Sequence, residues 1–157
     1  MSKADEVLSL YRDRGWMIAT AESCTAGMVA VAITDVAGSS DVFERGFVTY
    51  TNAAKIEMLG VRRETLETEG AVSEAVVEQM ARGAQAASRA DVAVSISGIA
   101  GPGGSGVKPE GRVCFGLATP RGWRSETVDF GALGRAGVRA AARDHALDLL
   151  TEAAGPG

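Results

Sequence analysis

The chain has 157 residues, of which 46% are hydrophobic and 23% are charged, as is usual for a globular protein of one domain. A formal net charge of -4 leaves no basic face for a nucleic-acid backbone, and no apolar run approaches the ~20 residues of a membrane span. Two cysteines without CxxC spacing and a single histidine argue against a disulfide framework and a zinc site. The opening residues are unlike a signal peptide. We therefore expect one cytoplasmic domain over residues 1–157, without nucleic acid, membrane, metal or cofactor.

Helix and strand patterns alternate over most of the chain. Apolar residues at helical spacing, with capping residues at the ends, predict helices over residues 3–14, 25–33, 52–60, 62–68, 73–87 and from 135 onward. The second of these helices is apolar on every side, which predicts that it is buried. Alternating or continuous apolar runs predict strands over residues 16–21, 47–50, 91–97, 112–119 and 123–130.

The order of these elements indicates an α/β fold. The last two strands are joined by the short turn Pro120-Arg121-Gly122, which is typical of a hairpin, whereas the earlier strands are separated by helices. We predict a three-layer α/β/α sandwich whose five-stranded mixed sheet is mostly parallel, with one antiparallel strand. Ligands of such sheets bind outside the carboxyl ends of the strands, so the residues that follow strands are the candidates for a site.

The segment Glu22-Ser23-Cys24-Thr25 lies where the first predicted strand meets a helix. A side chain at such a junction faces the ligand crevice, and the free N–H groups of the helix start can hold an oxyanion. Ser23 is therefore a candidate nucleophile, with Cys24 as its rival. Spacing alone favours a simpler interpretation, in which Ser23 or Thr25 caps the helix.

Tyr50 and Lys55 flank the start of the third predicted helix. With Thr51 or Asn52 as the N-cap, Lys55 lies in the first turn, where the helix dipole disfavours a cation and lowers the pKa of the amine. A lysine that deprotonates readily can act as general base for a serine; the alternative is a solvated surface lysine. Tyr50 can pass a proton or position a substrate, or else it is a half-buried aromatic residue of the strand.

A glycine-rich loop, GIAGPGGSGVKPEG over residues 98–111, follows a predicted strand. Successive free N–H groups in such a loop can hold a phosphate, and glycines let a ligand approach the backbone. The pattern matches neither the dinucleotide-binding fingerprint nor the P-loop, so a plain structural loop is the alternative, although loops beyond about 12 residues are usually functional. Gly38-Ser39-Ser40 is a second, weaker candidate of the same kind.

Four residues late in the chain carry further charged or reactive groups. Arg135 and Arg139 lie one turn apart on the last predicted helix and can bind a phosphate or carboxylate, or else they belong to a solvated face. His145 falls on the apolar face of that helix, and we interpret it as a packed residue and not as a catalyst. Cys114 is predicted to lie in the core.

Several motifs of the chain, taken together and in order, resemble the CinA C-terminal domain family, whose stand-alone members are nicotinamide-nucleotide amidohydrolases. The resemblance covers roughly residues 5–152, and the N-terminal domain of full-length CinA has no counterpart here. Matched spacing of several motifs makes it specific. The matching segments are AESCTAG (21–27), AGSSDVFERGFVTYTNAAK (37–55), LGV (59–61), GAVS (70–73), SGIAGPGG (97–104) and KPEG (108–111).

The resemblance implies an enzyme that deamidates nicotinamide mononucleotide to nicotinic acid mononucleotide and ammonia, without a metal, in pyridine nucleotide recycling. It also implies the three-layer fold and a homo-oligomer. The family's catalytic serine, tyrosine and lysine match Ser23, Tyr50 and Lys55, so we expect Lys55, helped by Tyr50, to activate Ser23 for attack on the carboxamide. A non-catalytic nucleotide-binding module that regulates a partner, or an amidase for another carboxamide nucleotide, would keep the same motifs.

In the family the glycine loop and a C-terminal arginine are attributed to substrate binding, and backbone N–H groups after the serine would hold the oxyanion. The residues that we expect to bind substrate are Glu22, Cys24, Thr25, Gly38, Ser39, Ser40, Ser97, Gly98, Gly101, Gly103, Gly104 and Arg139.

The chain departs from the family pattern at a few positions. Ala26 stands where the family usually has a glycine, Ala37 replaces a proline, and Ser97 replaces a threonine but retains the hydroxyl. The common Gly-Asp-Arg before the last helix becomes Leu133-Gly134-Arg135, which alters the setting of Arg135. The three catalytic positions are retained.

Overall fold

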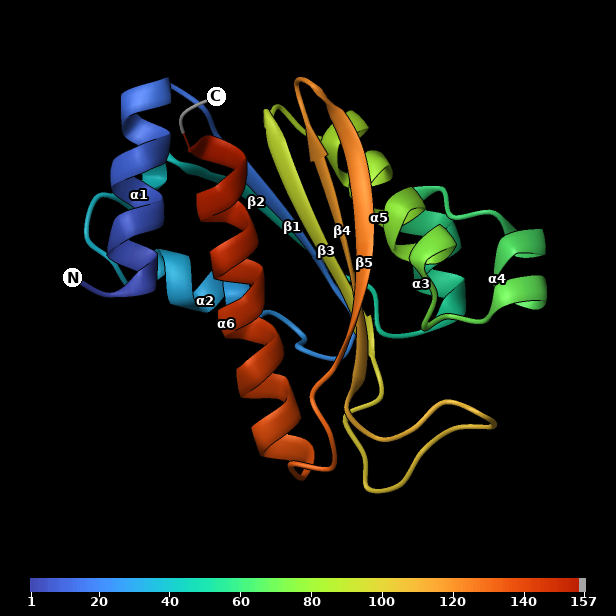
Figure 1. Ribbon diagram of the computed structural model, residues 1–157. Coiled ribbons are helices and arrows are strands. Elements are labelled where there is room, and N and C mark those ends of the chain that lie inside the picture. Colours follow the sequence, from blue (N-terminus) through green and yellow to red (C-terminus); the bar gives the residue numbers. More distant parts are fainter. Residues whose placement is uncertain (156–157) are drawn as a thin grey trace.

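The computed structural model describes residues 1–155, and its centre is a five-stranded sheet with the strand order β2-β1-β3-β4-β5 (Figure 1). The strands are β1 (Ile18–Glu22), β2 (Phe43–Val48), β3 (Val92–Gly98), β4 (Arg112–Thr119) and β5 (Gly122–Asp129). β1 pairs in parallel with both β2 and β3, whereas β4 pairs antiparallel with both β3 and β5. β4 therefore runs against the other four strands, which confirms the prediction of a mixed sheet with one antiparallel member.

Helices cover both faces of the sheet, as the three-layer prediction requires (Figure 1). The helices are α1 (Lys3–Arg14), α2 (Met28–Thr34), α3 (Asn52–Leu59), α4 (Arg63–Glu69), α5 (Glu74–Ala86) and α6 (Arg135–Ala154), with a 3-10 turn η1 (Ser39–Asp41). One hydrophobic cluster joins α1, α2 and α6 to the sheet, and a second joins α3, α4 and α5 to its other face. None of the helices described over residues 1–155 combines the length and apolar character needed to cross a bilayer.

Capping residues explain where several helices begin. Ser2 accepts a hydrogen bond from the backbone of Asp5 and completes a capping box before α1. The hydroxyl of Thr51 accepts the N–H of Ala54 at 3.1 Å, so Thr51, and not Asn52, caps α3. Ser73 caps α5 in the same way, through the N–H of Val76. Local side-chain chemistry thus sets three of the helix starts that the sequence predicts.

Two expectations about the first half of the chain are wrong. α2 is not buried on every side: Val31 is 57% exposed, because the helix lies at the rim of the α1–α6 layer and buries only Val29 and Ile33. The strand predicted over residues 47–50 is β2, which begins at Phe43 and ends at Val48. β2 is an edge strand that carries charged residues, so it has no long apolar run to reveal it.

Candidate active site

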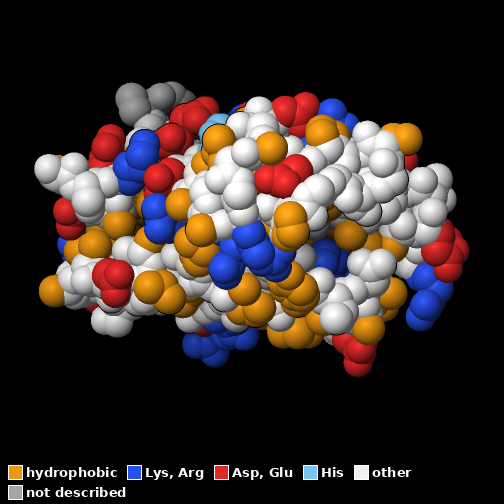
Figure 2. All heavy atoms as spheres, turned by 90° about the horizontal axis from the view of Figure 1, so that it is seen from below, with side chains coloured by type: hydrophobic (Ala, Val, Ile, Leu, Met, Phe, Trp, Pro, Cys, Tyr) orange, Lys and Arg blue, Asp and Glu red, His pale blue; other side chains and the backbone are white. Residues whose placement is uncertain are grey.

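A cleft of about 640 Å³ opens at the carboxyl ends of β1, β2 and β3. Its walls come from the turn after β1, the β2–α3 connection, the segment before α5, the glycine loop and the start of α6. Figure 2 shows this end of the molecule, where Lys and Arg side chains lie among hydrophobic ones near the middle of the face. The charged side chains that line the cleft are Lys55, Lys108 and Arg135. The site thus lies where ligands of α/β sheets bind, with a cationic lining.

Ser23 and Lys55 meet at the floor of this cleft. Nζ of Lys55 lies 3.0 Å from Oγ of Ser23 and also donates to the carbonyl of Thr49 at 2.9 Å. Lys55 is only 1% exposed and Ser23 only 8% exposed, so the pair is shielded from bulk water. A serine hydroxyl and a lysine amine at this distance have the geometry of a nucleophile and its general base.

Burial lowers the pKa of Lys55, because removing the ammonium from water penalises its charged form. Among the residues described, no carboxylate forms an ion pair with Lys55 that would oppose this effect. The alternative of a solvated surface lysine is therefore wrong. The sequence predicts the direction of the pKa shift correctly, and burial is its largest cause.

A sharp turn between β1 and α2 presents Ser23 to the cleft. The N–H of Ser23 donates to the carbonyl of Ile96 on β3, and the N–H of Ala26 returns to the carbonyl of Ser23 at 3.1 Å. Ala26 has φ 46° and Gly27 has φ 104°, so the chain passes through two left-handed residues within the turn. Along this path Ser23 reaches Lys55 while Cys24 packs in the core cluster, although both residues line the cleft.

Replacing Ala26 with glycine is expected to stabilise the fold by about 0.5–1 kcal/mol, because glycine avoids the left-handed penalty of roughly 1–2 kcal/mol but loses more chain entropy. Chemical denaturation at constant m-value measures the change. The matched control is Ala32→Gly inside α2, where glycine should destabilise by about 1 kcal/mol. A loss of stability in Ala26→Gly equal to that of the control would contradict the strain seen in the turn.

The thiol of Cys24 is buried, which raises its pKa to about 11. A protonated thiol is a weak nucleophile, and this one is packed among hydrophobic side chains. The carbonyl of Cys24 accepts a hydrogen bond from Nε of Arg139 at 2.9 Å. The geometry therefore favours Ser23 over Cys24 as the attacking residue.

Glu22 and Thr25 lie behind the turn and are fully buried. The carboxylate of Glu22 accepts the hydroxyl of Thr25 at 2.6 Å and the N–H groups of Val29 and Ala30 at 3.0 and 3.1 Å. Glu22 thus satisfies the start of α2, and the interpretation of Ser23 or Thr25 as its cap is wrong. Of the expected substrate contacts, these two support the nucleophile turn and do not line the cleft.

The glycine loop forms one wall of the cleft. Ser97, Gly98, Gly101, Gly103 and Gly104 all line it, where the sequence predicts them. The expectation of free N–H groups along the loop is wrong in part. The N–H of Gly103 donates to Oε1 of Glu110 at 2.7 Å, and other N–H groups of the loop donate to backbone carbonyls, namely those of Ile99, Ser105, Lys108 and Gly111. The loop is thus partly held by its own side chains.

The two arginines of α6 have different surroundings. Arg135 lines the cleft and donates to the carbonyl of Gly101 and the hydroxyl of Tyr50, both at 2.7 Å. Both acceptors are neutral, so the charge of Arg135 is not compensated by these bonds. Arg139 bonds to the carbonyl of Cys24 instead and is not part of the lining. Of the two candidates, the structure thus places Arg135 at the cleft, whereas the resemblance implies that Arg139 binds the substrate.

Tyr50 lies at the rim of the cleft and is 56% exposed. Its hydroxyl is bonded to Arg135, whereas the contact with Lys55 involves the backbone carbonyl of Tyr50, 3.4 Å from Nζ. The expected help from the Tyr50 hydroxyl to Lys55 is therefore not seen in this arrangement. The phenol instead faces the same space as the guanidinium of Arg135.

The chain does not bring Gly38, Ser39 and Ser40 to the cleft. α2 carries the chain back to the amino ends of the strands, so this segment precedes β2 at the opposite end of the sheet. The carbonyl of Gly38 accepts a hydrogen bond from Arg12 of α1 at 2.8 Å. In this structure the segment is part of the packing between α1 and the loop before β2.

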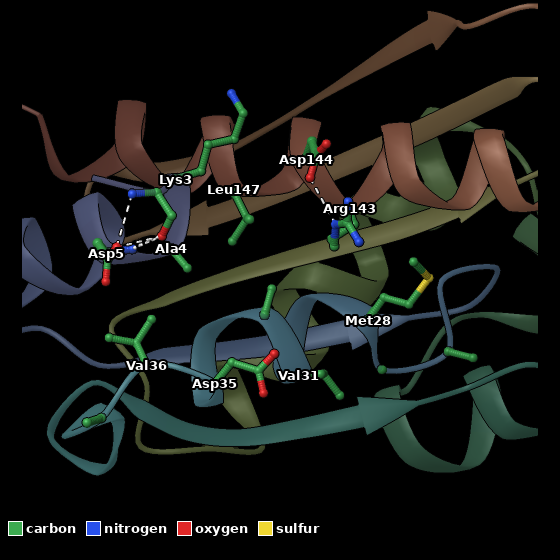
Figure 3. Close-up of a pocket in the computed structure, with 15 residues that line it drawn as sticks. Lys3, Ala4, Asp5, Met28, Val31, Asp35, Val36, Arg143, Asp144 and Leu147 are labelled. Carbon is green, nitrogen blue, oxygen red and sulfur yellow. Dashed lines mark hydrogen bonds and ion pairs between the residues drawn. The ribbon is translucent and has the colours of Figure 1, made fainter.

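A second, larger groove of about 1060 Å³ lies between α1, α2 and α6. Figure 3 shows Val31 and Asp35 on one side of it and Leu147 and Arg143 on the other. Arg143 is paired with Asp144 at 2.9 Å, and the serine that lines the groove, Ser2, is the N-cap of α1. No serine–lysine contact like that of the cleft is present among these lining residues, so the cleft is the better candidate for chemistry.

The remaining polar candidates occupy structural positions, as predicted. His145 packs against Phe115, with ring centroids 4.5 Å apart, and lies 3.1 Å from Glu126. Cys114 is buried beside Thr127. Within residues 1–155, no group of three His, Cys, Asp or Glu side chains has the arrangement needed to hold a metal ion.

Lys108, which lines the cleft, and Glu110, which lies beside its glycine loop, have no role in the sequence analysis. Nζ of Lys108 donates to the carbonyls of Glu69 and Val72 at 2.9 and 2.6 Å. Glu110 binds the backbone of the loop in which it lies. Both residues lie at the end of the glycine loop, and charged residues at that place are the signal that could have identified them in the sequence.

The chain is similar to proteins of one family. The model of the CinA C-terminal domain family matches residues 1–154. The chain is 61% identical over 123 residues to the nicotinamide-nucleotide amidohydrolase PncC of Escherichia coli (strain K12), which covers 78% of this chain and 74% of the relative. It is 60% identical over 129 residues to the Shigella flexneri protein of the same name, a match that covers 79% of this chain and 78% of the relative.

A solved structure, the competence/damage inducible protein CihA from Agrobacterium tumefaciens, is 47% identical to the chain. It superimposes with a TM-score of 0.93 over 96% of this chain and 92% of the other. The family model extends across all the strands and loops that form the cleft. This chain belongs to the CinA C-terminal domain family.

Proposed function

We propose that this protein hydrolyses the carboxamide of nicotinamide mononucleotide, giving nicotinic acid mononucleotide and ammonia in pyridine nucleotide recycling. The observation that carries the proposal is the buried contact of 3.0 Å between Ser23 Oγ and Lys55 Nζ at the floor of the cleft. The names of the relatives from Escherichia coli and Shigella flexneri supply the nucleotide.

The proposed reaction proceeds through an acyl-enzyme. Neutral Lys55 takes the proton of Ser23 while Oγ of Ser23 attacks the carboxamide carbon. The backbone N–H groups of Cys24 and Thr25 stabilise the resulting oxyanion. The lysine then returns the proton to the leaving nitrogen, which departs as ammonia. A water molecule, deprotonated by Lys55, attacks the ester and releases the carboxylic acid and Ser23. The depressed pKa of Lys55 supports this role, because a larger fraction of the amine is neutral near physiological pH.

The charge of the cleft supports a phosphorylated substrate. Apart from Lys55, which acts in its neutral form, its ionisable lining residues include Lys108 and Arg135, and no Asp or Glu is among the described residues that line it. Arg135 donates only to neutral acceptors, so its charge is available to an anion. We propose that Arg135, rather than Arg139, provides the arginine contact to the phosphate.

An ammonia-release assay with purified protein and nicotinamide mononucleotide tests the function directly. We expect turnover that is unchanged by EDTA. Binding of the nucleotide without release of ammonia would instead support a regulatory, non-catalytic module. Turnover that EDTA abolishes and a divalent ion restores would contradict the metal-independent mechanism.

The phosphate contact predicts a preference for the nucleotide over nicotinamide riboside, which lacks the phosphate. Losing a charge-assisted hydrogen bond should lower kcat/KM by about 10–150-fold, and Arg135→Ala should remove most of this preference. Arg139→Ala should retain it and lower kcat on both substrates, by up to about a hundredfold, because it loosens the nucleophile turn. Steady-state kinetics of the two variants on both substrates measure these effects. If only Arg139→Ala lost the preference for the nucleotide, Arg139 and not Arg135 would be the phosphate contact.

A further inference from the structure

The carboxylate of Glu110 joins two segments that are far apart in the sequence. Oε1 accepts the N–H of Gly103 in the glycine loop at 2.7 Å, and Oε2 accepts the N–H of Gly134 at 3.2 Å. The side chain also packs against Gly101, where a Cβ atom would lie 2.5 Å from the carboxyl carbon of Glu110. Both carboxylate oxygens of Glu110 are therefore used in hydrogen bonds, and the side chain occupies the space that a Cβ atom at position 101 would take.

These contacts bear on the cleft through Arg135. Gly134 is the N-cap of α6, and Arg135 is the first residue of that helix. Arg135 reaches back to the carbonyl of Gly101, so the loop and the helix start are connected once through Arg135 and once through Glu110. The two connections close a ring that fixes the distance between the glycine loop and the guanidinium.

Lys108 holds the other side of the same loop. Its ammonium donates to the carbonyls of Glu69 and Val72, on the opposite wall of the cleft. The backbones of Ser105 and Lys108 exchange two hydrogen bonds of 2.9 Å, which close the loop tip into a narrow turn. With the tip held by Lys108, the position of Gly101 and Gly103 depends on Glu110.

We propose that Glu110 is a positioning residue for substrate binding, which holds the glycine loop and Arg135 in the spacing that receives the phosphate of the nucleotide. Glu110 is not among the residues that line the cleft, so it acts through its neighbours. The inference rests on the proposed function for its substrate. The arrangement of the loop itself can be tested without any substrate.

Glu110→Gln is the informative variant, because glutamine keeps the size of the side chain but offers one acceptor oxygen in place of two. One of the two N–H groups then faces an amide NH₂ and loses its bond. Glu110→Asp retains the charge but shortens the reach. The matched control is Glu64→Gln on α4, an exposed residue whose contact with Arg62 is 3.9 Å long and outside the cleft.

Hydrogen exchange of the free protein is the first measurement. We expect Glu110→Gln to exchange faster than wild type in peptides that cover residues 99–107 and 131–136, with β3 and β4 unchanged. The control variant should match wild type throughout. Unchanged exchange in the loop would overturn the proposal, because Glu110 would then not hold the loop in place. Faster exchange that extends through the sheet would also overturn it, because it would show a general loss of stability.

Kinetics supply the second measurement. Glu110→Gln should raise KM for nicotinamide mononucleotide by about tenfold, change kcat by less than about threefold, and leave kcat/KM for nicotinamide riboside nearly unchanged. Glu110→Asp should lie between wild type and Glu110→Gln. An equal loss on both substrates, or a fall in kcat at constant KM, would overturn the positioning role. If wild type releases no ammonia, the proposed function fails, and hydrogen exchange alone decides whether Glu110 fixes the loop.

Discussion

Replacing Ser23 with alanine is expected to lower kcat for nicotinamide mononucleotide by about a thousandfold or more, without loss of the fold. The variant removes the oxygen that lies 3.0 Å from Lys55, while the turn is still held by the backbone bond from residue 23 to Ile96. Ammonia release measures the rate. Circular dichroism and the denaturation midpoint show whether the protein remains folded.

Cys24→Ala is the matched control for the nucleophile. The thiol is buried and its pKa is raised to about 11, so we expect the variant to keep most of the activity and the wild type to resist thiol alkylation. A small loss of stability is expected from the cavity left in the core. An inactive Cys24→Ala beside a nearly normal Ser23→Ala would refute the serine mechanism, even if the substrate is correct.

Lys55→Met is expected to reduce kcat to about the level of Ser23→Ala, because a serine without a base is a weak nucleophile at neutral pH. In wild type, kcat/KM should rise with pH through the depressed pKa of Lys55, since only the neutral amine accepts a proton. The increase should occur below pH 10.5, the ordinary value for lysine, and then level off. Lys55→Met should abolish this dependence.

Two further variants separate the basicity of Lys55 from its charge. Lys55→Arg keeps a cation that does not deprotonate in this pH range, so it should be as inactive as Lys55→Met. The double variant of Ser23→Ala and Lys55→Met should lose little more than either single variant, because the two residues act as one unit. An active Lys55→Arg would show that Lys55 contributes through its charge, and additive losses would show that the two residues act independently.

Much of the fold follows from local signals in the sequence. Ser2, Thr51 and Ser73 cap the helices that they precede, and the hairpin of β4 and β5 follows from its short turn. β2 is less predictable, because an edge strand with charged residues has no apolar pattern along its length. The exposure of α2 depends on its position at the rim of a layer, which periodicity does not encode.

The site is predictable to a smaller degree. The position of Ser23 after a strand and that of Lys55 in the first turn of a helix make both residues candidates. Their contact exists only once β1 and β2 pair side by side. Arg135 and Arg139 share one face of α6, so the choice between them depends on how far along its axis the helix extends past the cleft. Gly38 resembles a loop residue of a site, yet a crossover helix carries it to the other end of the sheet.

The burial of Lys55 also couples proton release to folding. In the unfolded chain this lysine has its ordinary affinity for a proton, whereas the folded protein binds that proton less tightly. Between the depressed value and pH 10.5 the unfolded state therefore carries more protons at this residue, and the contribution of Lys55 to stability increases as the pH rises. The protonation state that suits the fold is the same one that the proposed base requires, so this residue imposes no conflict between a stable enzyme and an active one.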